Sequence, residues 1–307
     1  MTPKPNRLRP GDRVRVVSPA SPPDRTEVAR GVTLLSNWGL RVELGAHVFD
    51  TWAHYLAGRD EDRLADLNDA LRDPGVRAIV CTRGGKGAYR IADGLDFDAA
   101  RRDPKPLIGF SDITILHLAR WQRAGVGGFH GPYAAWNAAY YGSGAAEQLR
   151  CSLMEPATLV FHQDPSELTA KIVMPGRATG ILMGGNLALI AAAVGWVCPS
   201  FAGAILLIEA IDMPIGRIDS AVTQLLRSGV LEGLRGVAVG QFIRSAEELP
   251  GKWSAVDVLL ERFSSLGVPV LGGLPIGHGP RPPTVPLGTT ATIDTVARTL
   301  TVDAGVS

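Results

Sequence analysis

The sequence predicts an α/β protein whose first third forms a doubly wound parallel sheet. Two observations lead to this class. Short β-branched or apolar runs alternate with segments of helical periodicity, and proline or glycine separates them. The second observation is that the helical segments are long enough to carry the chain from one parallel strand to the next. We therefore expect helices on both faces of the sheet.

The elements of the first third follow one another at regular intervals. We expect strands at 14–17, 40–44 and 76–81, and helices at 26–38 and 61–71. Gly39 ends the first helix, and Pro74 and Gly75 end the second. A further short strand ends at Gly109. In a sheet of this kind a ligand binds beyond the carboxyl ends of the strands.

The rest of the chain differs in composition. Aromatic residues gather among alanine and glycine over 131–143, and a short helix is expected at 145–153. Farther on we expect helices at 186–194, 218–227 and 255–263, and strands at 204–208, 237–241, 292–293 and 299–302. These shifts predict an N-terminal domain at 1–135, a connecting segment at 136–165 and a C-terminal domain at 166–307.

The composition argues against several classes of protein. Of the 307 residues 46% are hydrophobic, and 31 Lys and Arg against 30 Asp and Glu leave a formal net charge of +1. No basic block interleaved with aromatics occurs, so we expect no nucleic-acid partner. The apolar runs are too short to span a bilayer, and the first ten residues lack the apolar core of a signal peptide. We expect a cytoplasmic protein with no membrane partner.

The cysteines and several histidines show no metal-ligand pattern. The three cysteines are far apart in the sequence, as expected of buried thiols in a reducing compartment. We therefore expect neither a metal nor a cofactor. The residues considered are Cys81, Cys151, Cys198, His47, His54 and His162.

Ser111 lies where a predicted strand turns into a predicted helix. At such a corner the serine hydroxyl is exposed beside the first N–H groups of the helix, which lack intrahelical partners. That environment stabilises an alkoxide or a developing oxyanion. The alternative is that Ser111 or Asp112 is an ordinary helix N-cap. The nucleophile elbow of α/β-hydrolases requires glycine two residues after the serine, and this chain has Ile113 there.

Three other places are candidates for chemistry. The stretch 83–87 follows a strand, and its glycines allow either a plain βα turn or a nest of N–H groups for an oxyanion. Glu209 closes an apolar strand, where a carboxylate forms either an inert salt bridge or the partner of a catalytic group. His278, between glycines and prolines, is either solvated or an aimed catalytic base. Ser111, Glu209 and His278 together suit a nucleophile, an orienting carboxylate and a base.

The chain resembles the serine LD-carboxypeptidases, which include muramoyl-tetrapeptide carboxypeptidases and microcin self-immunity peptidases. The resemblance runs over nearly the whole length and rests on several short motifs in a fixed order. The motifs are Arg9-Pro10-Gly11-Asp12, Ser18-Pro19-Ala20-Ser21, Arg83-Gly84-Gly85, Gly109-Phe110-Ser111-Asp112-Ile113-Thr114, His130-Gly131-Pro132, Gly184-Gly185-Asn186-Leu187, Glu209, Gly277-His278 and Val285-Pro286-Leu287-Gly288.

The resemblance implies a fold and a set of site residues. It implies a flavodoxin-like N-terminal domain, a smaller β-rich C-terminal domain and a homodimer. It also implies a triad of Ser111, Glu209 and His278. The implied oxyanion donors are the N–H groups of Asp112 and of Gly85 or Gly84. We add Arg83 and Gly84 as expected substrate-binding residues.

The resemblance also implies a function. We expect a serine peptidase that hydrolyses the amide between an L-configured centre and a C-terminal D-amino acid of murein tetrapeptide, in peptidoglycan recycling. One alternative is a microcin-type peptidase that cleaves aminoacyl-nucleotide amides, and another is a non-catalytic protein that binds a small anion or nucleotide. Lys86, Trp196 and Ala210 depart from the family pattern, and Lys86 and Trp196 leave the choice of substrate open.

Overall fold

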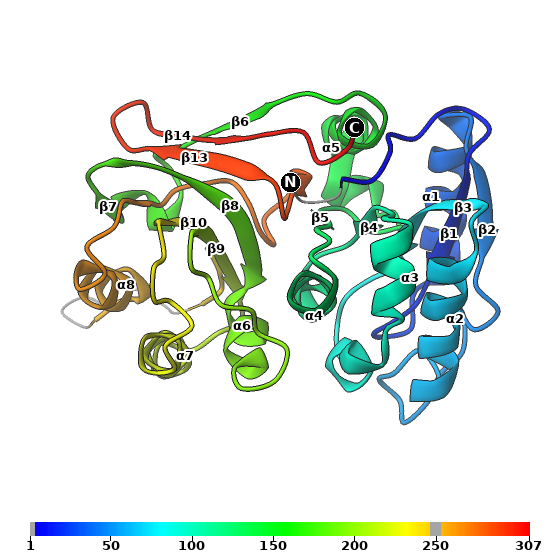
Figure 1. Ribbon diagram of the computed structural model, residues 1–307, viewed down its shortest axis with the longest axis horizontal. Coiled ribbons are helices and arrows are strands. Elements are labelled where there is room, and N and C mark those ends of the chain that lie inside the picture. The colour runs from blue at the N-terminus through cyan, green and yellow to red at the C-terminus, as the bar shows by residue number, and fades with distance from the viewer. Residues whose placement is uncertain (1–3, 246–252) are drawn as a thin grey trace. The chain divides into compact units, whose positions relative to one another are not determined.

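The computed structural model describes residues 4–245 and 253–307. The chain forms two compact units. Unit 1 comprises Met1–Ala157, Pro283–Gly288 and Ala304–Ser307, and unit 2 comprises Thr158–Pro282 and Thr289–Asp303. Each unit is built around its own sheet (Figure 1).

The sheet of unit 1 has six strands in the order β12-β5-β4-β3-β1-β2. The strands are β1 (Arg13–Val17), β2 (Arg41–Leu44), β3 (Val76–Cys81), β4 (Leu107–Ile108), β5 (Phe129–His130) and β12 (Val285–Pro286). The first five are parallel, and β12 pairs antiparallel with β5 at the edge. The order 2-1-3-4-5 is the flavodoxin-like arrangement, with its switch point between β1 and β3. The predicted doubly wound parallel sheet is confirmed.

Helices cover both faces of this sheet. They are α1 (Arg25–Asn37), α2 (Asp60–Arg72), α3 (Phe97–Arg102), α4 (Thr114–Ala124) and α5 (Ala138–Met154), with short 3₁₀ turns η1 (Ala88–Arg90), η2 (Ala92–Gly94) and η3 (Ser111–Ile113). Leu35 of α1 and Leu149 of α5 pack in one core with Val14 and Val16 of β1, because alternate residues of a strand face the same side. The helix α2 contacts β1 and β3, and α2, α3 and α4 contact one another in sequence.

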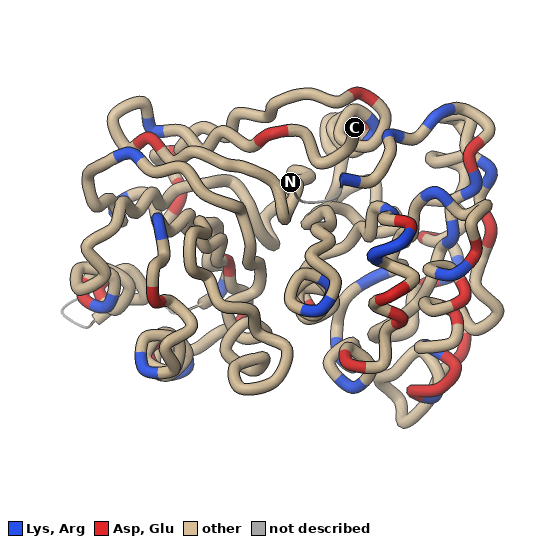
Figure 2. Tube along the Cα trace, in the orientation of Figure 1, with Lys and Arg blue, Asp and Glu red and all other residues tan. Residues whose placement is uncertain are grey.

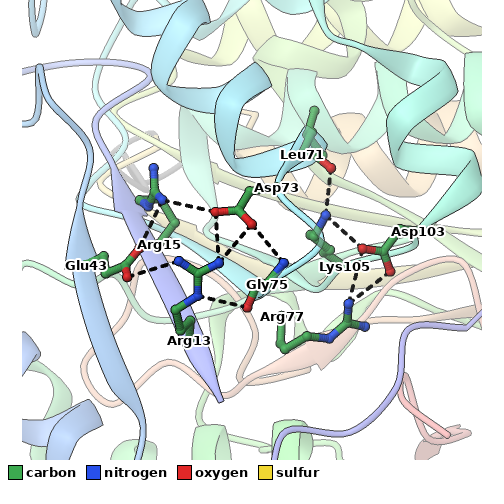
Figure 3. Close-up of polar contacts among 9 residues, drawn as sticks. All are labelled: Arg13, Arg15, Glu43, Leu71, Asp73, Gly75, Arg77, Asp103 and Lys105. Atoms are coloured by element: carbon green, nitrogen blue, oxygen red, sulfur yellow. Dashed lines mark hydrogen bonds and ion pairs between the residues drawn. The ribbon is translucent and has the colours of Figure 1, made fainter. Parts of the chain in front are cut away.

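Hydrogen bonds and ion pairs of charged side chains connect the amino ends of these strands (Figure 3). Arg13, the first residue of β1, donates to Asp73 at 2.8 Å and to Glu43 of β2 at 3.2 Å. The buried ammonium of Lys105 donates to the carbonyl of Leu71 at 2.6 Å and pairs with Asp103 at 3.0 Å. Figure 2 shows residues of both signs interspersed along this unit. The polar network occupies the end of the sheet away from the Ser111 corner.

The sheet of unit 2 has eight strands in the order β6-β14-β13-β8-β9-β10-β11-β7. The strands are β6 (Leu159–His162), β7 (Val173–Met174), β8 (Arg177–Asn186), β9 (Ala204–Ile211), β10 (Gly236–Ile243), β11 (Val270–Leu271), β13 (Thr290–Asp294) and β14 (Thr299–Val302). The strands β8 to β11 are parallel, and the flanking pairs are antiparallel. This mixed sheet makes the second unit β-rich, as expected.

The main helices of unit 2 lie side by side on one side of its sheet (Figure 1). They are α6 (Leu187–Ala193), α7 (Ile215–Arg227) and α8 (Ala255–Ser264), and a 3₁₀ turn η4 covers Leu168–Lys171. The side chain of Gln224 on α7 donates to the carbonyl of Ala191 on α6 at 2.9 Å. Arg262 of α8 donates to Asp219 of α7 at 2.7 Å. No described helix is both long enough and apolar enough to cross a bilayer.

Several elements differ from the expectations. The ten-residue strand β8 was not predicted, because its glycines carry no strand signal. Glu209 does not end its strand, since β9 continues to Ile211 through pairing with β10. The helix expected at 145–153 begins earlier, as part of α5 (Ala138–Met154), and Leu149 packs in the core of unit 1. Cys151 is partly exposed rather than buried. The division of the chain at residues 135 and 165 stays a prediction.

Candidate active site

Ser111 has a backbone conformation that few non-glycine residues adopt. Its φ is +57°, in the left-handed region, at the start of η3 and just after β4. Such a conformation costs about 1–3 kcal/mol and persists only where neighbouring contacts impose it. Neither η3 nor α4 has a side-chain cap at its amino end, so the interpretation of Ser111 or Asp112 as an ordinary N-cap is wrong.

Two side chains hold the carbonyls that precede Ser111. The hydroxyl of Tyr133 donates to the carbonyl of Phe110 at 2.6 Å, and the two rings stack with centroids 4.5 Å apart. The Nε2 of His117 lies 2.9 Å from the carbonyl of Gly109. Burial lowers the pKa of His117 to about 3, so the ring is neutral and its Nε2–H donates to that carbonyl. These bonds fix the corner from which the Ser111 side chain projects.

The glycine turn after β3, residues 83–87, packs directly against the corner at Ser111. A Cβ atom on Gly84 would lie 3.0 Å from Ser111 Cβ, 3.3 Å from the Asp112 nitrogen and 2.3 Å from the Tyr133 hydroxyl. Only glycine fits there. Gly85 has a φ of +105°, which an L side chain rarely adopts. The structure thus brings Gly84 against Ser111 and Asp112.

Ser21 anchors the glycine turn from the loop after β1. Its N–H donates to the carbonyl of Gly84 at 3.2 Å, and its hydroxyl accepts the N–H of Lys86 at 3.1 Å. The side chains of Arg83 and Lys86 are exposed, and the guanidinium of Arg83 donates to the carbonyl of Pro22 at 3.4 Å. Exposed cations beside a row of N–H groups make this edge attractive to anions.

In unit 2, the carboxylate of Glu209 is fully buried and bonded on both oxygens. Its Oε2 lies 2.6 Å from Nδ1 of His278, and its Oε1 accepts the side-chain amide N–H of Asn186 at 3.2 Å. Asn186 stands beside Glu209 in the register of β8 and β9. An ionised carboxylate only accepts hydrogen bonds, so it selects the tautomer of His278 with the proton on Nδ1. The lone pair then resides on Nε2, as a general base requires.

The loop that carries His278 is held by Gln241 on β10. The N–H of Gly279 donates to the side-chain oxygen of Gln241 at 2.7 Å, and the amide nitrogen of Gln241 donates to Glu167 at 2.6 Å. The backbone N–H of Gln241 donates to the carbonyl of Ile276 at 2.8 Å. The register of β10 against β9 shifts just here, and such bulges redirect side chains next to active sites.

Three residues that hold these groups were not predicted as site residues. Ser21, Asn186 and Gln241 were not among the candidates; Ser21 follows β1, Asn186 ends β8 and Gln241 lies inside β10, near its carboxyl end. Ser21 and Asn186 lie in two of the motifs that carry the resemblance, and Gln241 closes the strand expected at 237–241, where a ligand is expected beyond the carboxyl ends of parallel strands; these positions were the available signals. The candidate residues Ser111, Asp112, Gly84, Gly85 and Arg83 lie in unit 1. Glu209 and His278 lie in unit 2.

One group of side chains in the described residues has ligand atoms close enough for a metal. These atoms, from His47, Asp50 and Asp62, lie within 4.8 Å of one another. The three residues were not predicted as a group. The Nδ1 of His47 hydrogen-bonds Asp50 at 2.8 Å, and this bond raises the pKa of His47. The group is accounted for as partly exposed ion pairs, in which His47 lies 2.8 Å from Asp50 and 3.9 Å from Asp62.

Comparison with known families shows the family to which the chain belongs. Residues 14–131 match the model of the LD-carboxypeptidase N-terminal domain, and residues 179–293 match that of the LD-carboxypeptidase C-terminal domain. The chain belongs to the LD-carboxypeptidase family. The first match contains Ser111, and the second contains Glu209 and His278. The resemblance stated from the motifs is therefore confirmed, and the chain is a carboxypeptidase.

Individual relatives of this LD-carboxypeptidase agree over nearly their full length. A Streptomyces coelicolor protein, whose name assigns it provisionally to the carboxypeptidases, is 41% identical over 98% of this chain and 96% of its own. The murein tetrapeptide carboxypeptidase of Pseudomonas aeruginosa is 32% identical over 92% of this chain and 93% of its own. Among solved structures, the microcin C7 self immunity protein MccF has a TM-score of 0.86 at 22% identity, covering 99% of this chain and 100% of that one. The last comparison supports the fold.

Proposed function

We propose that this LD-carboxypeptidase hydrolyses the amide between an L-configured centre and the C-terminal D-amino acid of a murein tetrapeptide, with Ser111, Glu209 and His278 as a triad. The observation that carries the proposal is the 2.6 Å contact between Glu209 and His278, which prepares a general base. The choice of substrate is supported by the Pseudomonas aeruginosa relative, whose name is murein tetrapeptide carboxypeptidase.

In the proposed mechanism, His278 Nε2 takes the proton of the Ser111 hydroxyl as its oxygen attacks the peptide carbonyl. Glu209 stabilises the imidazolium that forms. The N–H groups of Asp112 and of Gly85, or Gly84, stabilise the tetrahedral oxyanion, and each donor contributes about 3 kcal/mol in the transition state. His278 then protonates the leaving amine of the D-amino acid. Water, deprotonated by His278, hydrolyses the acyl-enzyme and restores Ser111.

The remaining parts of the proposal concern binding and context. We propose that Arg83, beside Gly84, binds the C-terminal carboxylate of the peptide, since its guanidinium is exposed at the glycine turn. The nucleophile would belong to a domain at 1–135, joined by a segment at 136–165 to a domain at 166–307. Every step uses groups of the chain itself and needs no cofactor. The protein would act as a cytoplasmic homodimer, and its free cysteines agree with a reducing compartment.

A paired substrate assay tests this proposal. Purified protein is incubated with murein tetrapeptide and, separately, with an aminoacyl-nucleotide amide, and products are identified by mass spectrometry. We expect release of D-alanine from the tetrapeptide and a loss of at least about 10³-fold in rate for S111A. S36A, at an exposed serine of α1, is the matched control and should behave as wild type.

Each other outcome points to a different function. Cleavage of the nucleotide amide alone would favour the microcin-type alternative. Release of neither amino acid by the folded wild-type protein would favour a binding protein and overturn the proposal. Full activity in S111A would overturn the assignment of the nucleophile.

A further inference from the structure

The side chain of Asp112 does not cap the helical turn in which it lies. It is 2% exposed, and its Oδ2 accepts the N–H of Ala88 at 2.8 Å. Ala88 is the first residue of η1 and comes directly after the glycine turn. One residue therefore joins the Ser111 corner to the far end of that turn.

We propose that Asp112 is a positioning residue of the oxyanion hole. Its backbone N–H is one of the proposed donors, and its side chain holds the turn that carries the other donor at Gly85. This inference rests on the proposed function, because it assumes that Ser111 is the nucleophile.

The glycine turn depends on such anchors. Gly85 and Gly87 have φ values of +105° and +114°, so the segment between β3 and η1 is not part of a regular element. Ser21 holds it near the start, at Gly84 and Lys86. Asp112 holds it at the end, at Ala88. Ser21 bonds the residues on either side of Gly85, and Asp112 bonds Ala88, three residues farther on. Loss of either contact therefore loosens the segment that carries the Gly85 N–H.

The neighbours of Asp112 favour a charged acceptor at this place. Burial raises the pKa of Asp112 to about 6, but the N–H of Ala88, the guanidinium of Arg63 on α2 and the ammonium of Lys86 in the turn all oppose the rise, so the carboxylate form predominates at neutral pH. The buried Arg63 also donates to the carbonyl of Pro19, in the loop after β1, and to the carbonyl of Gly87, at the end of the glycine turn. Hydrogen bonds to an ionised acceptor are shorter and stronger than neutral ones. A carboxylate here holds the N–H of Ala88 more firmly than an amide.

The test compares D112A and D112N with wild type, with S111A and with D98A, a control at an exposed aspartate of α3. The readouts are kcat and KM on the tetrapeptide, and the rate at which a fluorophosphonate labels Ser111. The phosphoryl oxygen of the fluorophosphonate takes the place that the oxyanion occupies in the transition state. A donor displaced in the transition state lowers kcat and leaves KM unchanged.

We expect D112A to lower kcat and the labelling rate by about 10- to 100-fold, with KM within about twofold of wild type. D112N retains an acceptor for Ala88, so its loss in kcat should be only about 2- to 10-fold. D98A should match wild type. Full kcat in D112A, a loss carried by KM, or a D112N as slow as D112A would each overturn the inference.

The remaining outcomes distinguish failure of this inference from failure of the proposed function. If D112A does not fold, D112N decides alone: a several-fold loss in kcat at unchanged KM supports the inference, and wild-type kcat overturns it. If S111A remains active, the proposed function itself fails. If S111A is inactive and D112A keeps wild-type kcat, only the role of Asp112 fails.

Discussion

Glu209 Oε2 lies 2.6 Å from His278 Nδ1, and the carboxylate is completely buried while the imidazole side chain is 11% exposed. A buried acceptor of this kind fixes both the ring orientation and the tautomer of the histidine. Asn186 completes the arrangement by donating to the second oxygen of Glu209. The pair is therefore set up to stabilise a positive charge on His278.

The first prediction concerns this pair. Replacement of Glu209 by glutamine keeps the size of the side chain but removes the charge and presents an N–H or a neutral oxygen to Nδ1. We expect E209Q to lower kcat by about 10³- to 10⁴-fold with little change in KM. Steady-state kinetics on the tetrapeptide measures this, with circular dichroism to show that the variant folds. A kcat within tenfold of wild type would rule out Glu209 as the orienting group.

The second prediction concerns the loop that carries His278. Removal of the Gln241 side chain frees the N–H of Gly279 and leaves Glu167 without its partner. We expect Q241A to lower kcat by about tenfold, because a displaced base transfers the proton less efficiently. Q224A is the matched control, since Gln224 makes one hydrogen bond between α6 and α7. We expect Q241A to lose about 2–4 kcal/mol and Q224A about 1 kcal/mol of unfolding free energy, but only Q241A should lose kcat. Equal kcat in the two variants would contradict the positioning role.

The third prediction concerns the contact between Gly84 and Ser111. A methyl group at Gly84 would lie 2.3 Å from the Tyr133 hydroxyl and 3.0 Å from Ser111 Cβ, so the turn or the corner must shift. We expect G84A to lower kcat by about 100-fold or more, since a shift of about 1 Å misaligns nucleophile and donors. G144A is the control, because a Cβ there meets nothing within 4 Å. The idea fails if G84A and G144A have the same kcat.

The fourth prediction concerns pH and stability. Burial raises the pKa of Asp112 from an ordinary 3.8 to about 6 in the folded protein. The folded state then binds more protons than the unfolded state between about pH 4 and pH 6. The contribution of Asp112 to the free energy of unfolding therefore decreases as pH rises through this range, by about 3 kcal/mol in all.

Urea unfolding of wild type and D112N at pH 4 and pH 7 measures this effect. The amide that replaces the carboxyl group in D112N does not titrate, so the stability of this variant relative to wild type should increase from pH 4 to pH 7 by about that amount. All other groups are common to both proteins and cancel in the difference. A difference that does not change with pH would show that Asp112 has the same pKa in both states.

The sequence predicted most regular elements of the parallel sheet because their patterns are local. The apolar run at Val76–Cys81 and the capped helix Arg25–Asn37 carry their signals within a few neighbouring residues. The strand Arg177–Asn186 was missed, since its glycines show no alternation and only pairing on both sides makes it extended. The end of β9 was placed too early for the same reason, because pairing with β10 extends it past Glu209.

The sequence by itself determined the family, the α/β class and the identity of Ser111, Glu209 and His278 as candidates, because short motifs and local periodicity carry that information. Only the tertiary structure decided how the candidates are held. Asp112 bonds Ala88 across 24 residues, Gln241 bonds Glu167 across 74, and Glu209 meets His278 across 69. Contacts of this range follow from strand order and register, which arise from the packing of the whole sheet and leave no local pattern in the chain.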